Sequence, residues 1–162
     1  MSDETRTITL TVNGETVTRL VDARQHLVDF LRAELGLTGS HLGCEHGICG
    51  ACSVRLDGDV VRGCLMLAIQ ADGATIETVE GLTASGEVAD LQENFVERDA
   101  LQCGFCTPGM LITAAELLRE AAPKTREEIR EFLSGNYCRC TGYHAIVDAV
   151  ETTLNQRLEK TS

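Results

Sequence analysis

The sequence predicts an α+β protein in which a β-rich half, residues 1–80, is followed by a helical half, residues 81–162. Three observations lead to this prediction. Alternation of apolar and polar residues, with turn dipeptides between the alternating runs, is confined to the first half. Apolar residues at helical spacing, with capping residues at their ends, fill the second half. The eight cysteines divide into four in each half.

A hairpin is expected at the start of the chain. In residues 7–12 the side chains of Ile8, Leu10 and Val12 alternate with threonines, which is the period of a half-buried strand. Asn13-Gly14 follows, and this dipeptide is a strong signal for a tight hairpin turn. The return strand is expected over residues 16–21.

One helix and three further strands complete the first half. We expect Asp22 to be the N-cap of a helix over residues 23–35, with Gly36 at its C-terminal end. A loop rich in glycine and cysteine then occupies residues 38–52. The remaining strands are expected over residues 53–56, 59–61 and 74–78, the first two joined by Asp57-Gly58.

Four helices are expected in the second half, after a linker at residues 81–87 that is rich in Gly, Ser and Thr. Thr107-Pro108 is typical of a helix start, because proline is tolerated in the first turn. Thr125 and Glu128 have the spacing of a capping box. The expected helices cover residues 88–98, 107–121, 125–133 and 143–158.

Charge and hydropathy exclude several kinds of partner. The net charge is −11, and both halves are acidic, so a nucleic-acid partner is not expected. The apolar run at residues 65–69 is far shorter than the roughly 20 residues that span a bilayer, so no membrane insertion is expected. No secretory signal precedes the first strand, which favours a cytoplasmic location. Thiols stay reduced there, so the cysteines indicate metal or redox chemistry rather than a disulfide framework.

The first cysteine group has the spacing of a plant-type [2Fe–2S] site. Its members are Cys44, Cys49, Cys52 and Cys64, in the pattern C-x4-C-x2-C with a distant fourth cysteine. Glycines between these cysteines allow the close backbone approach and positive φ angles that a loop around a cluster needs. The alternatives are a zinc knot or reduced buried cysteines, but zinc sites favour two separated pairs.

The second cysteine group leaves the metal open. Cys103, Cys106, Cys138 and Cys140 form a C-x2-C pair and a C-x-C pair that are 31 residues apart. Two such pairs suit tetrahedral zinc as well as an iron–sulfur cluster. The second and fourth of these cysteines each precede an expected helix start, where free N–H groups stabilise thiolates of either kind of site.

No histidine is a better candidate for a metal ligand than the cysteines. Cys44 and His46 form a C-x-H pattern, half of a Rieske-type ligand set, and the C-x-x-H half is missing from the sequence. We therefore interpret His46 as a loop residue. No catalytic dyad and no glycine-rich phosphate loop are found, so no catalytic residue is assigned.

Three motifs resemble the small iron–sulfur subunit of the xanthine oxidase family of molybdenum hydroxylases. They are GCEHGICGAC at residues 43–52, LQCGFCTPGM at residues 101–110 and GNYCRCTGY at residues 135–143. The resemblance covers nearly the whole chain. It implies a plant-ferredoxin-like β-grasp domain over residues 1–80, followed by a four-helix bundle over residues 81–162. It also implies one [2Fe–2S] cluster in each domain.

The resemblance further implies the partners and the function. A large subunit would hold the molybdenum cofactor, a medium subunit would hold FAD, and the complex could form a dimer of heterotrimers. Gln102 and Cys140 would contact the pterin of the molybdenum cofactor. Electrons would pass singly from molybdenum through the helical-domain cluster and then the ferredoxin-like cluster to the flavin or another acceptor. The complex would hydroxylate an N-heterocyclic aromatic, a purine or an aldehyde with oxygen from water.

Other functions are compatible with parts of this pattern. Within the same family, the chain could serve a carbon monoxide dehydrogenase or an aryl-CoA reductase. A freely diffusing two-cluster electron carrier would need only the ferredoxin-like half, so the helical half disfavours it. A structural zinc protein would be colourless and contain stoichiometric zinc.

Overall fold

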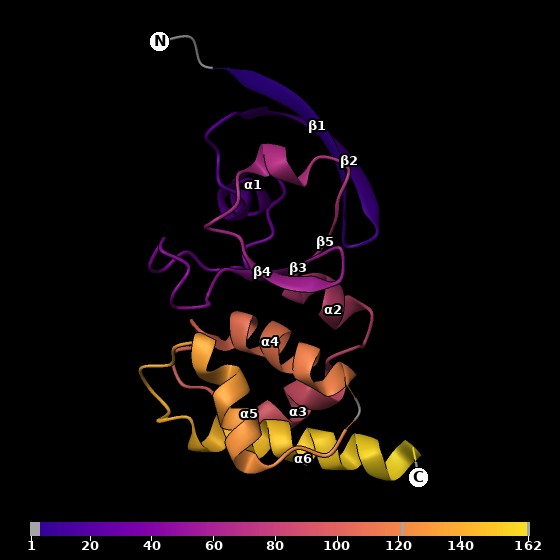
Figure 1. The fold of residues 1–162 in the computed structure, drawn as a ribbon, viewed down its shortest axis with the longest axis vertical. Coiled ribbons are helices and arrows are strands. Elements are labelled where there is room, and N and C mark those ends of the chain that lie inside the picture. The colour runs from indigo at the N-terminus through magenta and orange to yellow at the C-terminus, as the bar shows by residue number, and fades with distance from the viewer. Residues whose placement is uncertain (1–3, 121, 162) are drawn as a thin grey trace.

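The computed structural model describes residues 4–120 and 122–161. A half that contains the sheet stacks on a helical half (Figure 1). The two meet where strands β3 (Ser53–Leu56) and β4 (Asp59–Arg62) contact helix α4 (Thr107–Arg119). Among the described residues, none of the helices combines the length and the apolar character needed to cross a membrane.

The sheet has five strands in the order β2-β1-β5-β3-β4. Neighbouring strands are antiparallel except β1 and β5, which run parallel. All five predicted strands are present, with ends shifted by up to two residues. Besides β3 and β4 they are β1 (Thr5–Val12), β2 (Glu15–Asp22) and β5 (Thr75–Glu77).

Both predicted hairpin turns are confirmed. Asn13 and Gly14 have φ angles of 51° and 85°, and Asp57 and Gly58 have 49° and 98°. Two successive positive φ angles define the type I′ turn, whose twist matches that of the flanking strands. Alternation also determines burial, because Ile8, Leu10 and Val12 all point into the core.

The first helix is shorter than predicted. Helix α1 covers Leu27–Ala33 with His26 as its N-cap, while Asp22 ends strand β2 and accepts a hydrogen bond from the Arg24 N–H. Residues 25–27 pair with residues 66–68 instead, through Leu27 N–H to Met66 O and Ala68 N–H to Gln25 O. These long-range backbone bonds hold residues 25 and 26 extended, so the helix cannot begin at residue 23.

A short helix replaces part of the predicted linker. Helix α2 covers Val79–Ala84, whereas the sequence predicted a linker over residues 81–87. Val79 and Leu82 are buried in the core of the helical half, and Gly81 packs against Asn13. Tertiary burial therefore overrides the low helix propensity of this Gly- and Thr-containing segment.

The four predicted helices of the second half are present. They are α3 (Ala89–Glu97), α4, α5 (Arg126–Phe132) and α6 (His144–Thr161). The predicted end of α4 at residue 121 lies outside the described residues. The predicted capping box at α5 is confirmed, because Thr125 Oγ1 accepts the Glu128 N–H and the Glu128 carboxylate accepts the Thr125 N–H. Two short 3₁₀ helices, η1 (Ala68–Ala71) and η2 (Leu133–Gly135), were not predicted.

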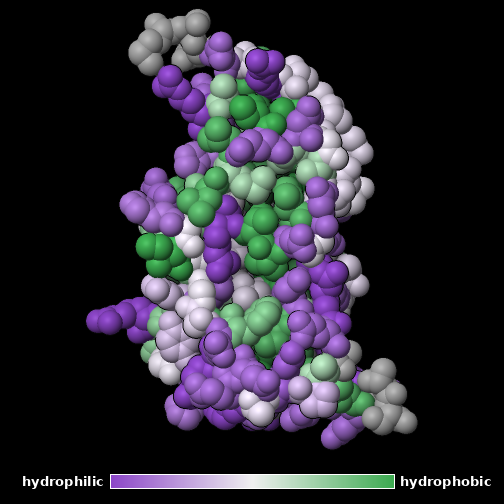
Figure 2. Space-filling model, viewed as in Figure 1, coloured by the Kyte–Doolittle hydropathy of each residue, from purple (hydrophilic) through white to green (hydrophobic). Residues whose placement is uncertain are grey.

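The two halves have separate main cores, and they are joined by Val60 of β4, which packs against the helical core, and by polar contacts. One core lies between the sheet and α1, and the other lies among the helices. Buried Arg55 of β3 forms ion pairs with Glu77 and Glu87, at 3.1 Å and 2.7 Å. On the face seen in Figure 2, apolar side chains gather over the middle of the sheet-containing half, and hydrophilic side chains dominate the helical end. The α+β fold predicted from the sequence is confirmed.

Candidate metal centres

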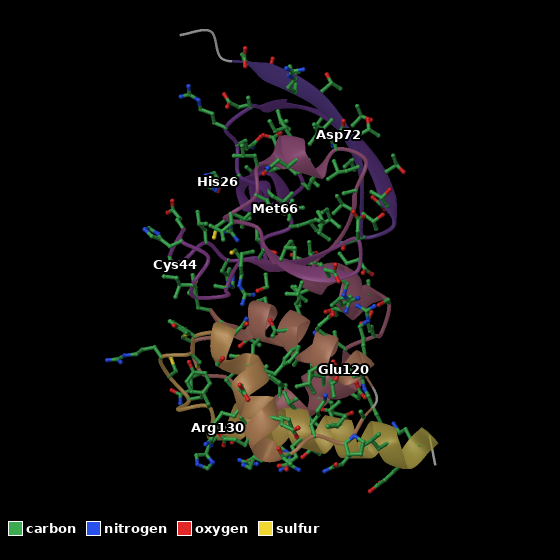
Figure 3. All side chains as sticks on the ribbon, viewed as in Figure 1. His26, Cys44, Met66, Asp72, Glu120 and Arg130 are labelled. Atoms are coloured by element: carbon green, nitrogen blue, oxygen red, sulfur yellow. The ribbon has the colours of Figure 1, made fainter. Side chains whose placement is uncertain are left out.

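The first cysteine group lies beside the junction of the two halves. Its first three members lie on the loop between α1 and β3, and Cys64 follows β4. Cys52 and Cys64 are buried, while Cys44 and Cys49 are half-buried. In Figure 3, Cys44 lies at the edge of the sheet-containing half, on the same side as His26.

The loop directs backbone N–H groups at sulfur. Glu45, Gly47 and Gly50 have positive φ angles of 56°, 75° and 75°, which curl the loop around Cys44. The N–H groups of Cys49 and His46 donate to Cys44 Sγ at 3.3 Å and 3.4 Å. These bonds, led by the one from Cys49, lower the pKa of the Cys44 thiol to about 6. The loop therefore favours a thiolate at this position.

Cys52 and Cys64 occupy the buried side of the same site. Burial raises the pKa of the Cys52 thiol to about 11, so this sulfur needs a cation to stay ionised. The start of α1 holds the segment around Cys64, because His26 Nδ1 lies 2.6 Å from Cys64 O and the Val28 N–H donates to Gly63 O. A buried thiolate that is fixed on both sides suits a metal centre rather than a reactive cysteine.

The second cysteine group lies at the end of the helical half nearest the first loop. Cys106 is the N-cap of α4, and burial raises the pKa of its thiol to about 12. Cys103 and Cys140 are exposed, and their sulfurs are 3.5 Å apart. Helix α6 begins at His144, one residue after its predicted start, and a turn in which Gly142 and Tyr143 have positive φ angles of 63° and 69° separates it from Cys140. Of these two helices, only α4 begins directly after a cysteine.

A turn at residues 138–143 places a hydroxyl donor beside the Cys138 sulfur. The Thr141 hydroxyl lies 3.2 Å from Cys138 Sγ, and the Cys138 N–H donates to the Tyr143 hydroxyl at 2.9 Å. Burial opposes ionisation of Cys138, but hydrogen bonds from the Thr141 hydroxyl and backbone outweigh it and lower the pKa.

Neighbouring thiols lie within interaction range of each other in both groups. The Cys103 and Cys140 sulfurs are in direct contact, and besides burial, the Cys64 thiol raises the pKa of Cys52 and the Cys138 thiol raises that of Cys106. Within residues 4–120 and 122–161, no three or more His, Cys, Asp or Glu side chains form a group that could hold a single metal ion. Two thiolates for each of two irons is the arrangement that a [2Fe–2S] cluster requires. The residues present therefore fit two such clusters.

Direct contacts join the two cysteine loops. The Tyr137 N–H donates to Cys49 O at 2.8 Å, and the amide of buried Asn136 donates to Gly50 O at 3.2 Å. His41 stacks on Phe105 with ring centroids 4.7 Å apart, and its Nδ1 lies 2.7 Å from Phe105 O. The two sites are thus held at a fixed separation rather than carried by independently moving domains.

The structure also places the two predicted pterin contacts together. Gln102 is exposed, and its Nε2 donates to Cys140 O at 3.2 Å. His46 is exposed as well, and its Nδ1 bonds to Cys44 O, which agrees with its interpretation as a loop residue. His41, Asn136 and Phe105 were missed. Asn136 and Phe105 lie inside the recognised motifs, but their contacts with the other half depend on how the two halves dock.

Two thiol-lined sites, one on a ferredoxin-like sheet domain and one on a helical domain, define a two-cluster iron–sulfur electron-transfer protein. Family models agree with this class. Residues 10–83 match a "2Fe-2S iron-sulfur cluster binding domain" and residues 78–151 match a "[2Fe-2S] binding domain". The chain belongs to the small iron–sulfur subunits of the xanthine oxidase family of molybdenum hydroxylases.

Several relatives are similar over most of their length. The caffeine dehydrogenase subunit gamma of Pseudomonas sp. (strain CBB1) is 53% identical over 148 residues, which are 90% of this chain and 89% of the relative. The nicotine 6-hydroxylase small subunit of Paenarthrobacter nicotinovorans is 55% identical over 143 residues, 88% of this chain and 86% of the relative. A chain of quinoline 2-oxidoreductase from Pseudomonas putida 86 superposes with a TM-score of 0.88 at 47% identity, covering 96% of this chain and 97% of that one.

These similarities identify an iron–sulfur cluster rather than zinc at the second cysteine group, where the spacing of the cysteines left the metal open. The chain is an iron–sulfur subunit of a multi-subunit molybdenum oxidoreductase, without a substrate site of its own, and it carries two [2Fe–2S] clusters. Its general role is electron transfer within such a complex, which includes a large molybdenum-binding subunit.

Proposed function

We propose that this chain conducts electrons one at a time from a molybdenum centre in the large subunit to a flavin in a medium subunit. The observation that carries the proposal is the arrangement of two thiol sites joined by a direct backbone contact. Each [2Fe–2S] cluster supplies a one-electron carrier. The chain's own residues hold the two carriers, exclude water from one side of each and fix the distance between them.

We assign all eight cysteines as ligands. Cys44, Cys49, Cys52 and Cys64 bind the first cluster, and Cys103, Cys106, Cys138 and Cys140 bind the second. The contact between the Cys103 and Cys140 sulfurs and the N–H and hydroxyl donors to the Cys44 and Cys138 sulfurs support this assignment. A domain boundary near residue 80 goes with it, one cluster to each domain.

A short connection between the two sites supports electron transfer within the chain. Cys49 accepts the Tyr137 N–H through its carbonyl oxygen, and Tyr137 precedes Cys138. One hydrogen bond and a few covalent bonds therefore link a ligand of the first cluster to a ligand of the second. Because the surrounding contacts of Asn136 and His41 are also fixed, electron transfer between the clusters needs no domain movement.

The exposure of two cysteines of the second site indicates the direction of electron transfer that we propose. Cys103 and Cys140 are exposed together with Gln102, whose amide is held by Cys140 O. We propose that this edge faces the pterin of the molybdenum cofactor and that electrons enter there. They leave from the side of Cys44 toward the flavin. A dimer of heterotrimers, in the cytoplasm, completes the proposed assembly.

The names of the similar proteins indicate a substrate class for the complex. They refer to caffeine, nicotine and quinoline, which are N-heterocyclic aromatics. We propose that the complex hydroxylates a compound of this class, which includes the purines, with oxygen from water, and that an aldehyde is the nearest alternative. This choice depends on the large subunit rather than on any residue of the present chain.

Two cysteine variants of the purified complex test the order of transfer. With Cys64→Ala, substrate should reduce the second cluster while the flavin stays oxidised, because the path is broken beyond that cluster. With Cys103→Ala, substrate should reduce neither the first cluster nor the flavin. Electron paramagnetic resonance of the frozen substrate-reduced complexes distinguishes these states. Reduction of the first cluster by substrate in Cys103→Ala would show that the order is wrong.

A further inference from the structure

The turn at residues 138–143 is closed by three hydrogen bonds among three residues, two of them donated by backbone N–H groups. The Cys138 N–H donates to the Tyr143 hydroxyl, the Tyr143 N–H donates to Thr141 Oγ1 at 3.1 Å, and the Thr141 hydroxyl lies 3.2 Å from Cys138 Sγ. Tyr143 has a φ angle of 69°, a conformation that costs an aromatic residue free energy unless its surroundings enforce it. The three bonds enforce it here.

These bonds also determine where the hydroxyl proton of Thr141 points. Because Thr141 Oγ1 already accepts the Tyr143 N–H, one of its lone pairs is occupied. A cysteine sulfur that binds iron is a thiolate and can only accept. The proton between Thr141 Oγ1 and Cys138 Sγ therefore belongs to the hydroxyl, and Thr141 is the donor.

We infer that the Thr141 hydroxyl sets the reduction potential of the second cluster, as a positioning and tuning residue for electron uptake. The inference rests on the proposed ligation of the second cluster by Cys138. Reduction adds one negative charge to the cluster and its sulfurs. A hydrogen bond to sulfur is stronger when the sulfur carries more charge, so it stabilises the reduced state and raises the potential.

The position of this donor determines which electron-transfer step it affects. The second cluster is the one that we propose takes electrons from molybdenum, so its potential decides whether that step is downhill. The corresponding donors at Cys44 are backbone N–H groups, which only a substitution by proline removes. At Cys138 a side chain supplies one of the donors, so a conservative substitution there can change the potential of the second cluster.

Thr141→Val and Thr141→Ser test the inference in the purified complex. Valine keeps the shape and removes the donor, while serine keeps the donor. A redox titration followed by electron paramagnetic resonance measures both midpoint potentials, with the first cluster as the internal reference. At a fixed solution potential, Thr141→Val should lower the reduced-to-oxidised ratio of the second cluster about threefold to tenfold, which is about 30–60 mV for one electron. Thr141→Ser should leave it close to wild type.

Each result supports or overturns the inference. Equal midpoint potentials in wild type, Thr141→Val and Thr141→Ser, with both clusters present, would overturn it. If Thr141→Val does not retain the second cluster, Thr141→Ala replaces it with the same expected shift, because alanine deletes the hydroxyl without adding an apolar methyl beside sulfur. Retention of both clusters in Cys138→Ala would instead show that the proposed ligand set is wrong, independently of Thr141.

Discussion

Gly109 lies where helix α4 packs directly on the loop of the first cluster. A Cβ atom built on Gly109 would lie 2.2 Å from Gly50 O and 3.2 Å from Ala51 Cα. Both neighbours are backbone atoms between Cys49 and Cys52, so neither can move aside as a side chain would. Gly109→Ala must therefore separate the helix and the loop by about 1 Å, since Cβ contacts shorter than 3.0 Å essentially never occur.

The expected loss of stability follows from this overlap. Overpacking of a tight interior contact costs about 1–3 kcal/mol. Replacing glycine by alanine in a helix returns up to about 1 kcal/mol. The net loss should be about 1–2 kcal/mol. With a urea slope of about 2 kcal/mol/M, this lowers the unfolding midpoint by about 0.5–1 M.

Urea unfolding of the cluster-loaded chain, followed by the visible absorbance of the clusters, measures this loss. Glu116→Ala is the matched control, because it changes a polar residue of the same helix whose ion pair with Arg119 is solvent-accessible, and it should shift stability by less than about 0.5 kcal/mol. If Gly109→Ala is as stable as Glu116→Ala, the close packing of α4 on the cluster loop is not a stabilising feature of the fold.

Three further predictions concern two ion pairs, a buried hydrogen bond and a helix cap. A hydrogen bond from Arg55 lowers the pKa of Glu87 below its unfolded value of about 4.5, and one from Arg157 lowers the pKa of Asp90 below about 3.8. The two carboxylates therefore contribute fully to folding stability above these unfolded values, and this contribution is lost as the pH falls through the lower pKa values of the folded state. Acidification from about pH 5 to about pH 2.5 should therefore lower the urea midpoint of wild type more than that of Glu87→Gln/Asp90→Asn, and parallel curves for the two would contradict this. Asn136→Leu keeps the number of side-chain heavy atoms, but it leaves the Thr113 hydroxyl without its acceptor and removes the hydrogen bond to Gly50 O, so it should cost about 1–3 kcal/mol in the same assay, whereas Thr113→Val, which removes only the donor to Asn136, should cost less. Thr125→Ala should cost about 1 kcal/mol through loss of the α5 N-cap and Thr125→Ser much less, and equal midpoints for the two variants would show that the cap does not stabilise α5.

Local signals in the sequence predicted most of the fold. The two hairpins follow from Asn13-Gly14 and Asp57-Gly58, because few other dipeptides adopt two positive φ angles. Helix α5 follows from the capping box at Thr125. In these cases the determining contacts lie within a few residues of each other along the chain.

The errors arise where distant segments decide local structure. Asp22 has the side chain of an N-cap, but pairing of residues 25–27 with residues 66–68 moves the helix start to Leu27. Helix α2 forms in a segment of low propensity because Val79 and Leu82 reach the helical core. Neither the pairing nor the core could be located before the topology was known.

The same difference between local signals and contacts of distant segments holds at the candidate sites. Spacing alone indicated the metal of the first cysteine group, because its three near cysteines define one loop. For the second group, the spacing of two distant pairs left zinc open, and motif resemblance and then family similarity were needed. The junction contacts of Asn136, His41 and Gly109 could not be predicted, since they depend on the docking of two independently patterned halves.

Iron and acid-labile sulfide, measured per chain in the purified complex after correction for the partner subunits, test the central claim most directly. The account predicts about four irons and four sulfides for this chain, two of each at every group of four cysteines. Stoichiometric zinc in place of iron, or only about two irons per chain, would contradict it.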